Sequence, residues 1–381
     1  MTHCAYLLLL APALWSAAQM PAGRPATPQP ENLVRSGVAA RQHGDLKTAI
    51  ADFRQALALH PGLVEAQVGL GEALVSAGDL DDAIDLDRQA LAASPDNLGL
   101  QTNLGVAYYR KGNLADARRQ FEALHSAHPD DLNATVMLGY TYNKLGRTAD
   151  TIALLGPLEA GHLTDLGLEY ALGFALLDTG NHAQGIARIE KVAAARHAAD
   201  AWMLAARARF ELQQFKQALV AAQRAIEADS AFPGEHTLAG QALFAMGEPD
   251  KATGEFQAAL RQNPSDFTAN LYLGILRFNQ HDLTSAKPLL ELALSIHPQD
   301  PLTRLEMAKL QNMQGNAGDA LSILESLVKS DPDWIDPHIE LAALYYKLHR
   351  PDDGLRERQV VKKLEDLQQK RGPSARTTSP Q

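Results

Sequence analysis

Residues 64–97 read VEAQVGLGEALVSAGDLDDAIDLDRQALAASPDN, and this stretch decides the fold of the chain. Apolar residues recur every three or four positions in each half of it, which predicts two amphipathic helices. Gly78 separates the halves, and glycine tolerates the positive φ with which many helices end. Pro95 ends the second half, because proline cannot continue a helix interior. The stretch therefore predicts two helices joined by a tight turn.

The same pattern recurs at a period of 34 residues. Its turn glycines are Gly44, Gly78, Gly112, Gly146, Gly180, Gly247 and Gly315, and its prolines are Pro61, Pro95, Pro129, Pro264, Pro298 and Pro332. The two groups of three prolines differ in phase by one residue, so we place a one-residue deletion near residues 190–198. With that deletion, Gln213, His281 and His349 take the remaining places of the glycine column.

Two further columns of the repeat contain small residues. Each unit has Gly or Ala eight residues from its start, from Gly37 in the first unit to Ala342 in the last. A second column, from Ala49 to Gly354, is also small. Small residues at helical spacing indicate two helices whose backbones approach closely, since larger side chains would push the pair apart.

These columns, together with an aromatic residue in the second helix of several units (Phe53, Phe121, Phe256), resemble the tetratricopeptide repeat family. The resemblance covers residues 30–370 and implies an all-α fold, a right-handed superhelical α-solenoid of antiparallel helix pairs. The predicted units span residues 30–63, 64–97, 98–131, 132–165, 166–198, 199–232, 233–266, 267–300, 301–334 and 335–370, the last with a charged capping helix.

Two units depart from the pattern. Gly156 and Pro157 interrupt the expected second helix of the fourth unit. The fifth unit has Gly185 where alanine is usual and is one residue short. We therefore expect the array to be kinked or loosened near residues 155–198.

The first 29 residues differ in composition from the repeats. Residues 5–15 are apolar, too short a run to span a bilayer, and the small residues Ser16, Ala17 and Ala18 follow them. We predict a signal peptide at residues 1–18, of a bacterial secreted or periplasmic type, although the segment has no Lys or Arg; an uncleaved leader or a mis-assigned start codon are the alternatives. Residues 19–29 are predicted to be a proline-rich linker, and residues 371–381 a disordered tail.

Composition argues against most kinds of chemistry. The formal net charge is −10, which disfavours nucleic acid as a partner because phosphates require clustered Lys and Arg. The single cysteine, Cys4, excludes a disulfide within the chain, and the thirteen histidines form no metal-binding motif. No nucleophile or phosphate-binding motif is present, and the repeats leave no span for a catalytic domain. We expect no enzyme activity, no cofactor, no metal and no integral membrane span.

In the tetratricopeptide repeat family, certain positions of the first helix of each unit face a ligand in the concave groove. In the fourth to eighth units the resemblance gives an apolar and aromatic set with a few amides and one Arg: Tyr140, Asn143, Tyr170, Phe174, Met203, Arg207, Phe210, Gln241, Phe244, Ile275 and Phe278. Rings supply contact area, while amides and Arg bind backbone carbonyls, so this set suits a bound peptide or helix. The alternative is that some of the rings pack between adjacent units.

The sequence therefore predicts a scaffold that binds a protein or peptide partner, in cell-envelope or secretion assembly. Two other functions stay open. One is a structural spacer or homo-oligomer whose groove is filled by its own chain, and the other, less favoured, is an enzyme.

Overall fold

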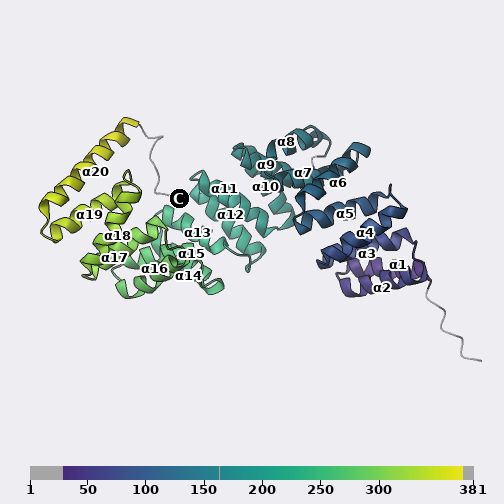
Figure 1. The fold of residues 1–381 in the computed structure, drawn as a ribbon, viewed down its shortest axis with the longest axis horizontal. Helices are drawn as coiled ribbons and strands as arrows, with labels where there is room; N and C mark the ends of the chain where they lie inside the picture. Colours follow the sequence, from purple (N-terminus) through teal and green to yellow (C-terminus); the bar gives the residue numbers. More distant parts are fainter. Residues whose placement is uncertain (1–28, 163, 372–381) are drawn as a thin grey trace, which may run out of the picture. The chain divides into compact units, whose positions relative to one another are not determined.

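The computed structural model describes residues 29–162 and 164–371, and within them the chain is helical without strands (Figure 1). The predicted signal peptide, all of the linker except Gln29, and all of the tail except Arg371 lie outside the described residues. The helices are α1 (Pro30–Gln42), α2 (Leu46–Leu59), α3 (Val64–Ala77), α4 (Leu80–Ala93), α5 (Leu98–Lys111), α6 (Leu114–Ala127), α7 (Leu132–Lys144), α8 (Thr148–Leu155), the 3-10 helix η1 (Gly156–Gly161), α9 (Leu166–Asp178), α10 (His182–Arg196), α11 (Ala199–Glu211), α12 (Phe215–Ala228), α13 (Glu235–Ala245), α14 (Pro249–Gln262), α15 (Phe267–Asn279), α16 (Leu283–Ile296), α17 (Pro301–Met313), α18 (Ala317–Ser330), α19 (Ile335–Lys347) and α20 (Pro351–Arg371).

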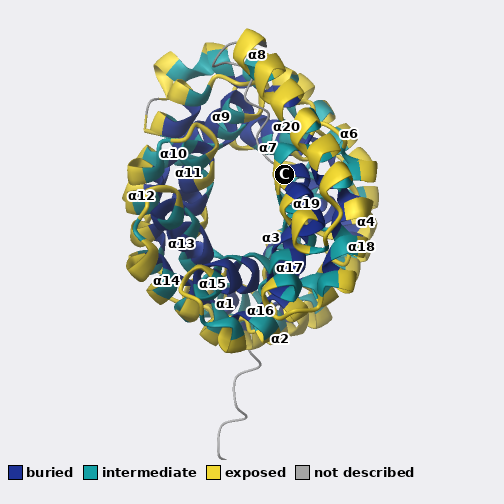
Figure 2. Ribbon diagram, turned by 90° about the vertical axis from the view of Figure 1, so that its left-hand side faces the viewer, coloured by how far each residue is buried: buried dark blue, intermediate teal, exposed yellow. Residues whose placement is uncertain are grey.

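The chain divides into two compact units: unit 1 runs up to Thr141, and unit 2 begins at Tyr142. In unit 1 the helices α1 to α6 pack in series, and in unit 2 the helices α8 to α20 do the same, as the repeat predicts. The first helices of successive pairs also contact one another, α1 with α3 and α3 with α5 in unit 1, and α11, α13, α15, α17 and α19 in series in unit 2. These first helices form one layer of each unit, and the second helices form the other layer. Buried residues are concentrated where the two layers meet (Figure 2).

The turn between the two helices of a pair has a left-handed residue throughout the array. All seven predicted turn glycines have positive φ, from +70° at Gly146 to +90° at Gly78. Gln213, His281 and His349 have φ of 56°, 61° and 59°, although side chains disfavour this region. The turn position thus requires a left-handed backbone conformation, which three residues other than glycine also adopt. These three are the residues that the one-residue deletion assigns to the turn position.

The aromatic residues of the second helices explain why the column from Gly37 to Ala342 on the first helices contains only Gly and Ala. The side chains of Phe53, Phe121 and Phe256 are fully buried. A Cβ atom added at Gly105 would lie 2.8 Å from the ring of Phe121, and one added at Gly240 would lie 2.7 Å from the ring of Phe256. Each ring therefore occupies the space that a side chain on the first helix would need.

The one-residue deletion lies in the connection between α10 and α11. Most pairs are joined by four residues that contain the recurring proline, such as residues 60–63 between α2 and α3. Here only His197 and Ala198 intervene, and His197 has φ of 50°. Helix α10 has 15 residues, one more than the 14 of most second helices, and α9, α10 and α11 still pack in series.

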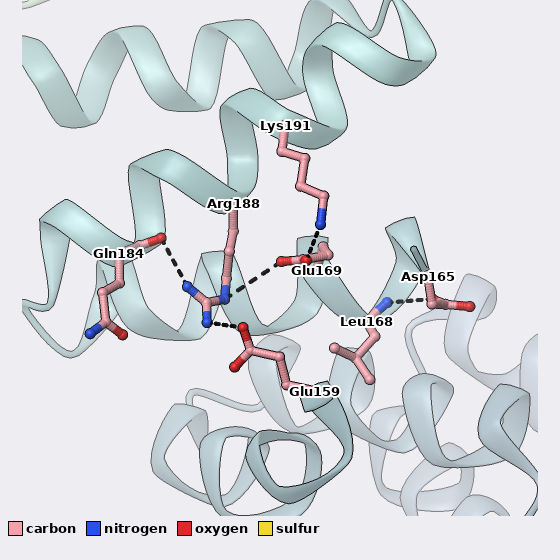
Figure 3. A network of polar contacts seen from close by, with 7 residues as sticks. All are labelled: Glu159, Asp165, Leu168, Glu169, Gln184, Arg188 and Lys191. Carbon is pink, nitrogen blue, oxygen red and sulfur yellow. Dashed lines mark hydrogen bonds and ion pairs between the residues drawn. The ribbon is translucent and has the colours of Figure 1, made fainter. Parts of the chain in front are cut away.

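The interrupted helix of the fourth unit is tied to its neighbours by an ionic network (Figure 3). Helix α8 ends at Leu155, as Gly156 and Pro157 predict, and η1 follows it. Arg188 of α10 pairs with Glu159 of η1 and lies 3.6 Å, Nε to Oε2, from Glu169 of α9. Lys191 also pairs with Glu169, whose side chain is 4% exposed. The network links the irregular segment to the α9–α10 pair.

The last helix, α20, combines two predicted elements. It begins at Pro351 as the second helix of the tenth pair and continues without a break through the predicted capping segment. Its buried Leu364 packs inward, while Leu355 and Leu367 are exposed.

Candidate functional site

The predicted groove residues lie on first helices, but the structure does not give them equal access to solvent. Met203 is 3% exposed and Ile275 is 8% exposed, and both belong to hydrophobic cores between layers. Their placement on an open binding surface is therefore corrected: successive first helices come close enough to cover both side chains. Tyr140 is half-buried in unit 1, whereas the other ten predicted residues belong to unit 2.

Several predicted rings serve packing as well as surface. The ring of Phe244 meets that of Tyr272 edge to face, with centroids 5.0 Å apart, and Tyr272 stacks on Phe256 at 5.7 Å. Burial raises the pKa of Tyr272, and a hydrogen bond with the side chain of Gln241 acts against this rise. Phe210 meets Phe215 edge to face at 5.3 Å. The contacts of Tyr272 with Phe244 and Phe256 join adjacent pairs, which was the alternative interpretation of the aromatic set, whereas Phe210 and Phe215 lie within one pair.

The remaining members of the set are half-buried or bonded within the unit. Tyr170 and Phe278 pack against hydrophobic cores with part of each ring exposed. Asn143 donates a hydrogen bond from Nδ2 to the carbonyl of Ala171, at 2.9 Å. This bond fixes the end of α7 against α9, so Asn143 positions the helices.

Phe174 and Arg207 come together in one hollow between α9 and α11, which we call the groove hollow. It has a volume of about 200 Å³ and is lined by Phe174, Leu177, Asp178, His182, Leu204, Arg207, Ala208 and Glu211. Phe174, Leu177 and Leu204 are half-buried, so each side chain keeps an accessible apolar face. Pockets for drug-sized ligands usually hold about 300–1,000 Å³, so this hollow suits a single side chain of a larger partner.

Polar groups surround the apolar floor of the groove hollow. Asp178, Arg207 and Glu211 are exposed, which gives its rim one positive and two negative charges. Asp178 accepts a hydrogen bond of 2.8 Å from the hydroxyl of Thr148, which fixes the carboxylate. Nδ1 of His182 is buried and has no hydrogen-bond partner within the described part of the chain. Sequence reasoning found Phe174 and Arg207 but missed the acidic rim, because Asp178 and Glu211 end their helices and resemble solvated residues.

A polar residue occupies the core of unit 1 where a ring is expected. Asp87 stands one period after Phe53 and one period before Phe121, and it is 0% exposed. Neither oxygen of its carboxylate has a hydrogen-bond partner among the described residues. Burial, and secondarily the charge of Glu72, raises the pKa of Asp87 from 3.8 to about 7.

Within the described ranges, no group of three or more His, Cys, Asp or Glu side chains is arranged to hold a metal ion. Over the same residues, none of the helices combines the length and apolarity that crossing a membrane requires.

Paired helices with left-handed turns and two columns of small residues define an α-solenoid repeat protein. Profiles of the tetratricopeptide repeat match residues 34–97, 170–234 and 237–301, and a second such profile matches residues 75–135 and 277–344. The chain belongs to the tetratricopeptide repeat family.

One curated protein is similar to a short part of the chain. The "Cell division cycle protein 27 homolog" of Caenorhabditis elegans is 36% identical over 90 residues, which are 23% of this chain and 11% of that protein. The chain thus spans about a tenth of the length of the curated relative that it matches.

Solved structures are similar at the level of the repeat. A tetratricopeptide repeat protein from Parabacteroides merdae has 16% sequence identity and a TM-score of 0.49, over 65% of this chain and 98% of that one. PilF of Pseudomonas aeruginosa has 17% identity and a TM-score of 0.48, over 54% of this chain and 94% of that one.

Proposed function

We propose that this chain is a protein-interaction scaffold that holds a peptide segment of a partner protein in the first-helix layer of unit 2. The groove hollow is the observation that carries the proposal. Its floor of Phe174, Leu177 and Leu204 offers apolar contact area that the fold leaves accessible. Proteins of this family generally serve as interaction scaffolds, which supports the assignment of class.

The rim of the groove hollow indicates which peptide would fit. An apolar side chain would enter between Phe174 and Leu204. The carboxylates of Asp178 and Glu211 would then favour a Lys or Arg beside it, while Arg207 would bind a backbone carbonyl or an acidic neighbour. We therefore infer a partner segment with a large apolar residue next to a basic one.

The experiment is selection of a phage-displayed random peptide library against the full chain. We expect enrichment of peptides that place Leu, Phe or Met beside Lys or Arg. The double variant Phe174→Ala/Leu204→Ala should lose the apolar preference, and Glu211→Lys should lose the basic one.

Leu292→Ala is the matched control, since Leu292 is 38% exposed on α16 in the other layer. The control should select the same peptides as the unaltered chain. Selection that is unchanged by the two groove variants, with the helical circular dichroism retained, would show that peptides bind elsewhere.

We also propose that the scaffold works outside the cytoplasm, in cell-envelope or secretion assembly. The support is the sequence of residues 1–18, with its short apolar run and small residues. N-terminal sequencing of the chain from fractionated cells of its source tests this. An N-terminus near Gln19 in the extracytoplasmic fraction is expected, and an intact N-terminus in the cytoplasmic fraction would contradict the proposal.

A further inference from the structure

Trp202 breaks a regularity of the repeat. The corresponding position of the first helix is polar in most units, and in several of them its side chain reaches the loop before that helix. Gln67 donates to the carbonyl of Pro61 at 3.1 Å, and Asn270 donates to that of Pro264 at 3.0 Å. The connection before α11 has only two residues and no proline. In place of a polar side chain, Trp202 has an indole that packs against Arg224 of α12.

The same pair has a second departure from the repeat. Ala222 occupies the column that holds Phe53, Phe121 and Phe256 in other units. Around Trp202 lies a hollow of about 410 Å³, which we call the indole hollow. It is lined by Glu190, Trp202, Arg209, Lys216, Gln217, Val220, Ala221 and Arg224, from α10, α11 and α12.

The cations of the indole hollow divide into one that is paired and two that are available. Arg209 binds Glu190 through two bonds, Nε to Oε1 at 2.7 Å and Nη2 to Oε2 at 2.9 Å, and also donates to Gln214. The guanidinium of Arg224 lies over the indole of Trp202, 4.7 Å from the ring centroid. Among the described residues, neither Arg224 nor Lys216 has an acidic partner.

The indole hollow is therefore locally basic on a chain whose net charge is −10. The ring holds the guanidinium of Arg224 in place, so its outward N–H groups are oriented before a ligand arrives. Between Arg224 and Lys216, the exposed Val220 supplies an apolar surface.

We propose that the indole hollow is a second binding site, separate from the groove hollow, for an extended acidic peptide segment of a protein partner. Lys216 and Arg224 are eight positions apart on α12, which is about 12 Å along a helix axis. Side chains of an extended peptide alternate in direction, and residues four apart lie about 13 Å from each other on the same face. Two carboxylates at that spacing meet both cations, and the side chain midway between them lies on Val220.

The test uses the peptide acetyl-Glu-Ser-Leu-Ser-Glu-amide, with the matched peptide in which both Glu are Gln. The readout is the indole N–H resonance of Trp202 in the full chain, assigned with Trp202→Phe. We expect saturable shifts with the Glu peptide and binding about tenfold weaker with the Gln peptide, because two exposed ion pairs are lost. Affinity should also fall as salt is raised.

Two charge variants separate this site from a general attraction to acids. Lys216→Gln/Arg224→Gln should lower the affinity for the Glu peptide about tenfold. Lys251→Gln/Arg261→Gln removes the same charge from α14 and should leave that affinity unchanged. Arg224→Lys keeps the charge but loses the planar stacking on the indole. Its affinity for the Glu peptide should lie between those of the unaltered chain and the double variant Lys216→Gln/Arg224→Gln. Each variant is compared at equal helical content.

Three outcomes would overturn the proposal. These are equal affinity for the Glu and Gln peptides, retention of affinity in Lys216→Gln/Arg224→Gln, or an equal response to sodium phosphate at the same concentration. The last would mean that the hollow attracts any anion. None of these results depends on the groove hollow, so the site fails or stands independently of the function proposed above.

Discussion

Asp87 makes the stability of unit 1 depend on pH near neutrality. Folding removes its carboxylate from water, and no described residue donates a hydrogen bond to it, so the charged form is disfavoured in the folded state. Because its pKa is raised from 3.8 to about 7, its contribution to stability is fully present below pH 4 and is lost as pH rises towards 7. At 1.36 kcal/mol per pKa unit, the total loss is about 4 kcal/mol, of which about 3 kcal/mol falls between pH 5 and 8.

The groups around Asp87 do not supply a compensating charge. Glu72 of α3 is itself acidic and is paired with Arg41 of α1, Nη1 to Oε2 at 2.7 Å. The amide of Asn103 on α5 donates to the carbonyl of Val68 at 2.9 Å. Within the described ranges, no cation close to the carboxylate therefore lowers its pKa.

Asp87→Asn is the matched change, since it keeps the size of the side chain and removes the titration. The variant should become more stable than the unaltered chain as pH rises, by about 3 kcal/mol more at pH 8 than at pH 5. Hydrogen exchange of the amides in α3, α4 and α5 measures this locally, with α15 to α17 in unit 2 as an internal reference. A difference between the two proteins that does not change from pH 5 to 8 would refute the reasoning.

Two further predictions concern the repeat columns. Gly240→Val should destabilise unit 2 by about 2 kcal/mol in urea unfolding, because the added Cβ would lie 2.7 Å from the buried ring of Phe256. The control is Gly254→Val, whose added Cβ has no atom within 4 Å. It should change the free energy of unfolding by less than about 0.5 kcal/mol. Equal effects of these two changes would contradict the packing argument. Gln213→Gly should stabilise unit 2 by about 1 kcal/mol in the same assay, because Gln213 has φ of 56°. Gln217→Gly, in the interior of α12, should destabilise unit 2 by a similar amount. A loss of stability in Gln213→Gly would count against backbone strain at the turn.

Much of the fold follows from local chemistry that the sequence displays. The turn column could be predicted even at His281 and His349, because the positions of prolines and small residues fix the register of each pair. The break at Gly156 and Pro157 was also predictable, because proline cannot continue a helix interior. The deletion before α11 was predictable because it shifts the 34-residue period of the prolines. The expected loosening near residues 155–198 took no account of the ion pairs of Arg188 with Glu159 and Glu169. These pairs join residues from three elements, so the sequence of any one element does not reveal them.

The candidate sites were predictable only in part. Phe174 was found because the family places that position in the groove, but the same rule also selected Met203 and Ile275, which are buried. The position of a residue along a helix determines the direction of its side chain. The exposure of that side chain depends on how closely the next helix approaches. Asp87 and Trp202 were missed because each is an ordinary residue in its own helix, and only its column shows it to be exceptional.

By itself the sequence determined the helix pairs, their turns and their order, because these depend on periodicity, glycine and proline within one unit. Tertiary structure decided which side chains stay accessible and how charges are placed. Asp178 and Glu211 come together with Phe174 only through the packing of α9 on α11, and Arg224 reaches Trp202 only because α12 lies against α11. Both depend on distances between helices, which arise from the packing of neighbouring units and are not encoded within any single one.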